Sequence, residues 1–120
     1  MGDITSNLSR NEFACKCGCG FDSMDVETIW VVQDVCDHFG CSVTITSANR
    51  CPAHNAKVGG AKTSQHLYSR AMDCKFSKSE PEAVHHYLLN KYEGRFGFGL
   101  YNTFNHIDTR TGPPARWDKR

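Results

Sequence analysis

Seven cysteines in a chain of 120 residues narrow the range of folds open to this protein. Cysteines at this density are typical of small secreted domains held together by disulfides. The count is odd, however, and residues 1–7 lack the basic stretch followed by an apolar stretch that marks a secretory signal. We therefore expect a soluble product made in the cytoplasm. The six histidines that accompany the cysteines make metal binding the leading question.

The composition predicts one domain, spanning residues 1–120. Hydrophobic residues make up 39% of the chain, and a chain this short has room for a single core. With 14 basic and 13 acidic residues and no long run of Lys or Arg, the sequence predicts no nucleic-acid partner. The longest apolar runs, such as residues 29–32, are far shorter than the ~20 residues of a membrane span. We expect no membrane partner and a monomeric protein.

Hydrophobic periodicity predicts two main helices. Ile29, Val32 and Cys36 recur at helical spacing, which indicates a helix over residues 25–39 that ends before Gly40. A second helix is expected to begin with a capping box, in which the hydroxyl of Ser79 and the carboxylate of Glu82 cap the first turn. This helix should end near Asn90.

Alternating patterns predict strands. They fall at residues 42–48, 71–76, 96–101 and 104–110, and the last two are joined by a short polar turn that indicates a hairpin. Two segments have no such period. Residues 8–22 are rich in turns and must be held by contacts with the rest of the chain, and residues 49–64 form a long loop of the kind that often carries a site. The expected fold is α+β with a largely antiparallel sheet.

A set of metal-ligating residue types occurs in the second half of the chain. His66 and Asp73 lie at the end of a loop and in the strand that follows it. His106 and Asp108 are two residues apart in a predicted strand, so their side chains leave the same face of the sheet. A catalytic zinc ion takes three nitrogen or oxygen ligands and leaves one position to water. Solvated surface residues are the alternative interpretation of the same pattern.

These motifs resemble the zinc D-alanyl-D-alanine carboxypeptidase family, which includes phage L-alanyl-D-glutamate endopeptidases and shares its fold with the hedgehog signalling domain. The resemblance rests on motifs that occur in the family's order and spacing, and it spans about residues 8–117. They are Ser64-x-His66 with Asp73, the preceding Ser47-x-x-Arg50 and Asn55–Ala61 stretch, and the His106-x-Asp108 pair. The resemblance implies a small α+β domain that binds zinc and cuts peptide bonds next to D-amino acids in peptidoglycan stem peptides.

The resemblance also implies roles for single residues. His66 and Asp73 match the first two zinc ligands, and His106 matches the third. Many relatives place a catalytic carboxylate where this chain has Thr103, so Asp108 is the nearest candidate for the general base. In the alternative assignment, Asp108 is the third ligand and His106 carries the proton.

Residues around these ligands are expected to bind substrate. Arg50 matches the arginine that grips a substrate carboxylate in the family, with a surface salt bridge as the alternative. Gln65 and Tyr68 are candidates for substrate contact, although Tyr68 is equally suited to the core. Ser69 stands where the family usually has glycine, which predicts a small local shift of the backbone.

The cysteines allow several pairings. Cys15-x-Cys17-x-Cys19 lacks the Cys-x₂-Cys spacing of common structural zinc sites. The resemblance implies that Cys51 lies against this N-terminal segment, which allows a disulfide to Cys17 or Cys19 or a second metal site. Reduced thiols that pack as small hydrophobic residues remain the third possibility. Cys36 and Cys74 are expected in the core.

Three classes of function follow from these features. The first is a zinc peptidase of peptidoglycan, of the kind used as a phage or prophage endolysin or as a lytic module on a virion. The second is a non-catalytic zinc-containing module of the same fold that binds peptidoglycan or another partner, as the missing carboxylate at Thr103 suggests. The third is a structural zinc module built from the cysteines alone.

Overall fold

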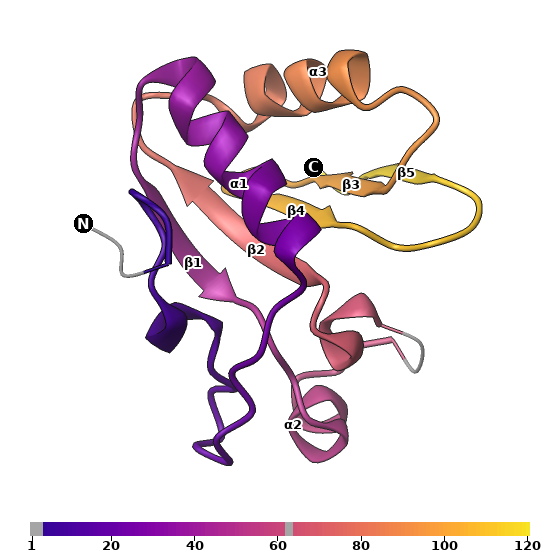
Figure 1. The fold of residues 1–120 in the computed structure, drawn as a ribbon. Helices are drawn as coiled ribbons and strands as arrows, with labels where there is room; N and C mark the ends of the chain where they lie inside the picture. The colour runs from indigo at the N-terminus through magenta and orange to yellow at the C-terminus, as the bar shows by residue number, and fades with distance from the viewer. Residues whose placement is uncertain (1–3, 62–63) are drawn as a thin grey trace.

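The computed structural model describes residues 4–61 and 64–120, and its centre is one five-stranded sheet (Figure 1). The strand order is β1-β2-β4-β3-β5. Every neighbouring pair is antiparallel except β3 and β5, which run parallel. The strands are β1 (Val43–Ser47), β2 (Ala71–Phe76), β3 (Gly97–Leu100), β4 (Asn105–Asp108) and β5 (Ala115–Asp118). The predicted α+β class, the largely antiparallel sheet and the β3–β4 hairpin are confirmed.

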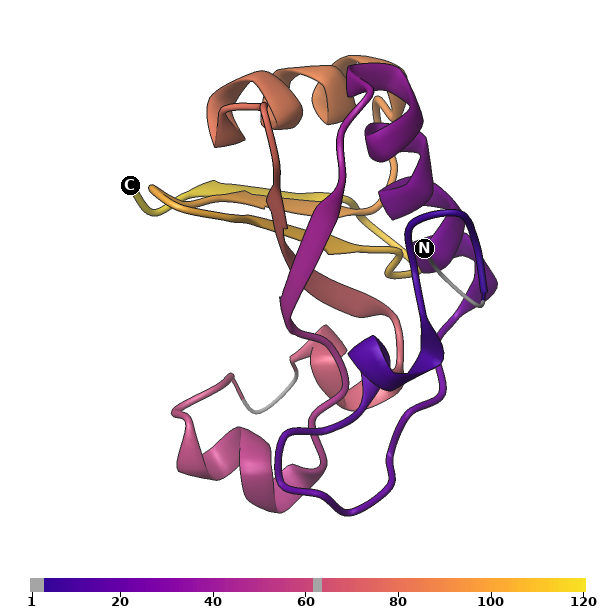
Figure 2. The same cartoon turned by 90° about the vertical axis from the view of Figure 1, so that its left-hand side faces the viewer.

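Two longer helices cover one face of the sheet (Figures 1 and 2). Helix α1 (Val26–Phe39) lies where its periodicity predicts, with Asp25 accepting a hydrogen bond from the Glu27 amide at 2.9 Å. It ends at Phe39 and is capped by Gly40, whose φ of 61° belongs to the left-handed region that glycine adopts at little cost. Helix α3 (Pro81–Lys91) is the second.

The start of α3 differs from its prediction. The helix begins at Pro81 with Glu80 at the N-cap position, so the Ser79–Glu82 capping box is wrong. Proline suits the first helical position because its φ is already fixed and its missing N–H would have no partner there. The Ser79 hydroxyl is buried and has no hydrogen-bond partner among the described residues.

The segment predicted as a loop over residues 49–64 contains a short helix, α2 (Pro52–Lys57), which again begins at a proline. Lys62 and Thr63 lie outside the described residues. A 3₁₀ helix, η2 (Gln65–Tyr68), then leads into β2. The sequence analysis also missed β5, which pairs with β3 at the edge of the sheet.

The core lies between the sheet and helices α1 and α3. Met72, Cys74, Phe98 and Ile107 alternate along their strands toward this side and are fully buried. The predicted core positions of Cys36 and Cys74 are confirmed.

The N-terminal segment, residues 8–22, reaches the same core through Leu8 and Phe13, which are buried. Phe13 closes a 3₁₀ helix, η1 (Arg10–Phe13), and its carbonyl accepts a hydrogen bond from the Asn49 amide at 3.2 Å. The predicted dependence of this segment on contacts with the rest of the chain is confirmed.

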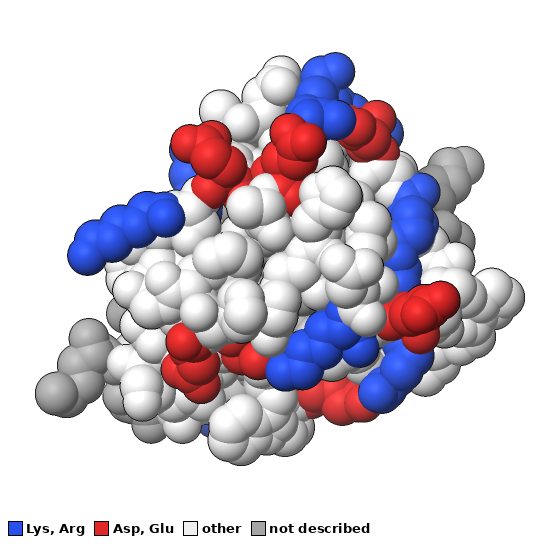
Figure 3. Space-filling model, turned by 90° about the horizontal axis from the view of Figure 1, so that it is seen from above, with Lys and Arg blue, Asp and Glu red and all other residues white. Residues whose placement is uncertain are grey.

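Charged side chains of both signs are intermixed on the face seen from above in Figure 3, over the helical side of the molecule. Within the described part of the chain, every helix is too short or too polar to span a membrane.

Candidate metal centre

One row of paired residues crosses four neighbouring strands, and its side chains lie on the sheet face that points away from α1 and α3. Asp73 on β2 pairs with His106 on β4, His106 pairs with Gly99 on β3, and Gly99 pairs with Trp117 on β5. Because side chains alternate along a strand, this row faces away from the core. A Cβ atom on Gly99 would collide with the Trp117 indole, so glycine is what lets the His106 and Trp117 rings approach to 4.9 Å between centroids.

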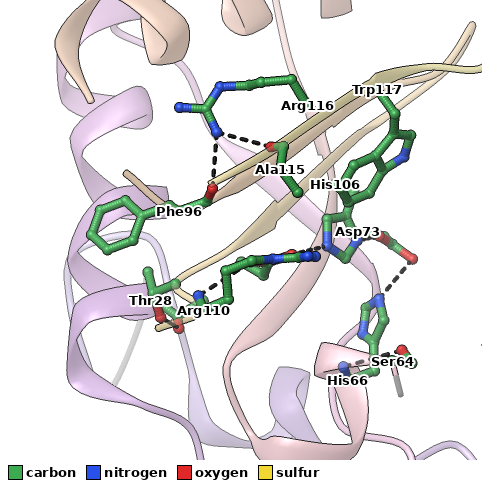
Figure 4. A network of polar contacts seen from close by, with 12 residues as sticks. Thr28, Ser64, His66, Asp73, Phe96, His106, Arg110, Ala115, Arg116 and Trp117 are labelled. Atoms are coloured by element: carbon green, nitrogen blue, oxygen red, sulfur yellow. Dashed lines mark hydrogen bonds and ion pairs between the residues drawn. The ribbon is translucent and has the colours of Figure 1, made fainter. Parts of the chain in front are cut away.

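His66 completes the set from below, as Figure 4 shows. It projects from η2 toward Asp73, and ligand atoms of His66, Asp73 and His106 all lie within 4.8 Å of one another. His66 Nε2 lies 3.4 Å from Asp73 Oδ2, and His106 Nδ1 lies 3.0 Å from Asp73 Oδ1. Neighbouring ligands of a tetrahedral zinc ion with bonds near 2.0–2.1 Å are about 3.3 Å apart. The three side chains therefore fit a zinc ion.

Both histidines have a hydrogen-bond partner behind the site. His66 Nδ1 lies 2.6 Å from the Ala48 carbonyl oxygen, and His106 Nε2 lies 2.7 Å from Asp108 Oδ2. When a metal ion is bound, an oxygen acceptor at each of these atoms holds the ring proton there, so the lone pair of the other nitrogen is available to the ion. Such backing orients metal-binding imidazoles and increases their basicity.

The charges of the site reinforce one another. Burial raises the pKa of Asp73, but hydrogen bonds and charge interactions with His106 and His66 outweigh burial and hold it below its ordinary value. Burial lowers the pKa of His106, but its contacts with Asp108 and Asp73 outweigh burial and raise it above its ordinary value. Asp73 is therefore a carboxylate at neutral pH, as a metal ligand must be.

Asp108 lies behind the site instead of facing its open side. Its side chain is fully buried, and Arg110 donates to it from Nε at 2.8 Å and from the terminal nitrogen Nη2 at 2.7 Å. Burial raises the pKa of Asp108, but Arg110 and His106 outweigh burial and lower it. A Cβ atom on Gly97 would lie 2.5 Å from the Asp108 oxygens, so this glycine makes room for the pair. The shared strand face of His106 and Asp108 is confirmed, whereas the role of Asp108 as general base stays a prediction.

Arg50 belongs to the centre and not to a surface salt bridge. Its side chain is 16% exposed, and Nη2 lies 3.4 Å from Asp73 Oδ2. Arg50 also donates to Ser47 Oγ at 3.1 Å and to Asn55 Oδ1 at 3.4 Å. These contacts hold the guanidinium beside the proposed ligands.

The centre opens into a pocket of about 440 Å³. Gln65 lines it, as expected of a substrate-contacting residue, whereas Tyr68 is 54% exposed and lines a smaller neighbouring hollow. Tyr68 therefore does not belong to the core, and its substrate contact stays a prediction. The described lining residues are Arg50, Gly59, Gly60, Ala61, Ser64, Gln65, His66, Asp73, Tyr101, His106, Arg110, Trp117 and Lys119.

Sequence reasoning missed the part of the wall that comes from the end of the chain. Trp117 Nε1 donates to the Tyr101 hydroxyl at 3.0 Å, and Lys119 follows on the same segment. Apolar and polar residues alternate over Ala115–Asp118, which is a strand signal in the sequence, but four residues after two prolines are too few to predict a strand with a partner.

Ser69 and Thr103 are the two residues at which the sequence departs from the pattern of the family that it resembles. Ser69 has φ 58° and ψ 36°, so it adopts the left-handed conformation that glycine favours, and the local shift of the backbone relative to the family stays a prediction. Thr103 is exposed in the turn between β3 and β4 and lies outside the described lining of the pocket.

Three buried ligands beside an open pocket leave a coordination position free, which is the arrangement of a catalytic metal centre and not of a closed structural one. The fold and this centre together define a small domain with a candidate catalytic metal site. A family model described as peptidase M15 matches residues 6–108, and the chain belongs to this family of zinc-dependent peptidases. The predicted family and the zinc cofactor are thereby confirmed. A search of curated proteins finds no match.

Proposed function

We propose that this metallopeptidase hydrolyses peptide bonds next to D-amino acids in peptidoglycan, either as a DD-carboxypeptidase or as an endopeptidase on stem peptides or cross-links. The observation that carries the proposal is the position of the His66–Asp73–His106 centre at the floor of a pocket lined by Arg50, Arg110 and Lys119. Stem peptides are small and rich in carboxylates, so a pocket with three cationic residues suits them.

Arg50 is the residue best placed to bind a substrate carboxylate. Its contacts with Ser47, Asn55 and Asp73 involve all three nitrogens, one partner each. A guanidinium has five N–H groups, so about two remain for a ligand in the pocket. Paired donors on a rigid fork match a carboxylate, which fixes the substrate chain beside the metal ligands.

A zinc ion held by His66, Asp73 and His106 would lower the pKa of a bound water and polarise the scissile carbonyl. The chain's own residues must then hold this centre in shape and move a proton. Asp108 keeps the predicted catalytic importance in this proposal, but it acts through His106 Nε2, which lies 2.7 Å from its carboxylate. This makes Asp108 a positioning residue that fixes the orientation and charge of the imidazole.

One experiment tests the activity and names the bond. Purified peptidoglycan is digested with the zinc-loaded protein, and the products are identified by mass spectrometry. Release of D-alanine identifies a carboxypeptidase, whereas new amino termini within stem peptides or cross-links identify an endopeptidase. Matched digests with the His66→Ala protein give the background. Intact stem peptides in both digests would contradict the proposal.

A second candidate function is a non-catalytic domain that binds stem peptides. Among the described residues that line the pocket, Asp73 is the sole carboxylate, so a general base is missing from the pocket wall. Binding of a soluble stem peptide without any product in the same digest favours this candidate.

We also propose that the protein acts as a phage or prophage endolysin, or as a lytic module on a virion. This proposal rests on the resemblance to phage endopeptidases. Lysis of cells that co-express the protein with a holin, compared with cells that lack the holin, tests the endolysin setting.

A further inference from the structure

A second group of metal-ligating side chains lies outside the centre described above. The Sγ atoms of Cys15, Cys17, Cys19 and Cys51, here called the cysteine cluster, all lie within 4.8 Å of one another. Cys17 Sγ is 3.4 Å from Cys15 Sγ and 3.5 Å from Cys51 Sγ. Figures 1 and 2 show the N-terminal loop beside the start of α2, where the fourth cysteine lies. All seven cysteines of the chain are free thiols.

The backbone brings the Sγ atoms of Cys15, Cys17 and Cys19 together without regular secondary structure. Gly18 and Gly20 have φ of 80° and 88°, which turns the chain back on itself between cysteines that are two residues apart. The loop closes through hydrogen bonds from the Gly18 amide to the Cys15 carbonyl at 3.1 Å and from the Cys15 amide to the Phe21 carbonyl at 2.8 Å. These turns bring the sulfurs together although the spacing is Cys-x-Cys. In the sequence analysis, the absence of the usual Cys-x₂-Cys spacing argued against a zinc site.

Backbone amides also point at two of the sulfurs. The Cys51 amide donates to Cys15 Sγ at 3.4 Å, and the His54 amide donates to Cys51 Sγ at 3.5 Å. Hydrogen bonds of this kind stabilise the negative charge of thiolates around a metal ion.

We propose that Cys15, Cys17, Cys19 and Cys51 bind a second zinc ion, which is structural and separate from the His66–Asp73–His106 centre. Four thiolates fill a tetrahedral shell and leave no position for water, as in closed structural sites. Zinc–sulfur bonds near 2.3 Å place neighbouring sulfurs about 3.8 Å apart, and the observed separations lie around that value. The inference does not depend on the proposed peptidase activity.

The alternatives explain fewer of these observations. A disulfide between Cys17 and Cys51 would leave two thiols beside it without a role. Unligated thiols would leave residues 16–20, all of them exposed, to be ordered with little burial to offset the loss of conformational entropy. A metal ion joins this loop to the start of α2 across 34 residues of sequence.

The location suggests what the second zinc ion does for the first centre. Cys51 directly follows Arg50, and the Arg50 amide donates to the His66 carbonyl at 3.0 Å. The proposed ion therefore fixes the backbone from which Arg50 reaches Asp73. The N-terminal loop and α2 should lose order together when the metal is removed.

The test counts zinc in the full-length protein purified under reducing conditions without chelators. We expect two zinc ions per chain in the wild type, one in His66→Ala and one in Cys17→Ser. Cobalt added to metal-free His66→Ala protein should give the intense visible and thiolate charge-transfer bands of tetrahedral Co(II)–sulfur coordination, and Cys17→Ser should lose the thiolate bands. Cys41→Ala, a cysteine change outside the cluster, is the matched control and should keep both ions.

Two further readouts keep the test valid if Cys17→Ser folds poorly. Cys19→Ser removes the other exposed ligand, and thiol labelling of the wild type needs no substitution at all. Cys17 and Cys19 are exposed, so a bound metal ion should protect them from a thiol reagent until a chelator is added. A His66→Ala protein that is folded, contains no zinc and gives no thiolate band with cobalt would overturn the proposal. A Cys17–Cys51 disulfide in freshly isolated protein would overturn it as well.

Discussion

The two groups of metal-ligating residues are built on different supports. In the His66–Asp73–His106 centre, two ligands are register partners on adjacent central strands, and each histidine is held from behind by an oxygen acceptor. In the cysteine cluster, three ligands lie on a loop without helix or strand, where Cys15 is buried and Cys17 and Cys19 are exposed. The first site is preorganised by the sheet, so it should persist without metal. The second is ordered by few other contacts, so it should depend on its ion.

The largest expected effect is on the His66–Asp73–His106 centre. His66→Ala should abolish hydrolysis and remove one zinc ion, because a catalytic zinc ion that loses one of three protein ligands is bound far more weakly. His86→Ala, a change at an exposed histidine on α3, is the control. Metal analysis and peptidoglycan digestion on both proteins check the prediction. Full activity in His66→Ala would remove this centre from the account.

Arg50→Lys probes the residue that lies between the two regions. An ammonium cannot reproduce paired guanidinium donors, and loss of charge-assisted hydrogen bonds costs ~1.5–3 kcal/mol, or about 10- to 150-fold in kcat/KM. Both zinc ions should remain. Steady-state kinetics on a stem-peptide substrate, with metal content measured on the same sample, check this. Unchanged kcat/KM would show that Arg50 only supports Asp73.

Asp108→Asn distinguishes a positioning residue from a general base. Loss of the carboxylate behind a ligating histidine typically weakens metal affinity or activity ~10- to 100-fold. If Asp108 positions His106, excess zinc should restore part of the rate. If Asp108 is the base, the rate should stay low at saturating zinc and the acidic limb of the pH profile should change. Thermal unfolding must be followed in parallel, because Arg110 loses its partner in this variant.

Acid should loosen the contact between α1 and α3, the helices that cover one face of the sheet. Burial raises the pKa of Asp34, but hydrogen bonds from Lys91, Tyr92 and Tyr87 outweigh burial and lower it. A carboxylate with a lowered folded pKa stabilises the fold above its unfolded pKa, and this stabilisation is lost as the pH falls through the folded value.

Asp34→Asn should therefore lower the free energy of unfolding by ~1–2 kcal/mol at pH 7, with a difference from wild type that shrinks below about pH 4. Denaturant unfolding across this pH range measures the difference. Glu93→Gln, at an exposed position, is the control. A difference that does not change with pH would show that the α1–α3 contact is not ionic.

The smallest effect is expected where η2 leads into β2. Ser69→Gly relieves a left-handed conformation that costs a non-glycine residue ~1–2 kcal/mol, but it gives up the 3.1 Å contact with Ser23 Oγ and adds freedom to the unfolded chain. The net gain in unfolding free energy should be about 0.5 kcal/mol. Ser23→Ala measures the hydroxyl contact alone. Greater destabilisation in Ser69→Gly than in Ser23→Ala would contradict this balance.

The sequence anticipates features that depend on local periodicity. The shared face of His106 and Asp108 follows from strand alternation, and α1 follows from its apolar stripe and Gly40. Features that depend on pairing between strands far apart in the sequence cannot be predicted from it. Nothing near Gly99 predicts that its strand pairs with a segment that brings Trp117 against His106. The position of Asp108 behind His106, with Arg110 as its partner, likewise depends on sheet register and on the space at Gly97.

Anomalous diffraction at the zinc absorption edge tests the central claim most directly. A crystal of the full chain grown without chelators should show one zinc peak bonded to His66, Asp73 and His106, with a water molecule toward the pocket. A second peak should lie among Cys15, Cys17, Cys19 and Cys51. Absence of the first peak, or a zinc ion bonded to Asp108 in place of His106, would contradict the proposed His66–Asp73–His106 centre.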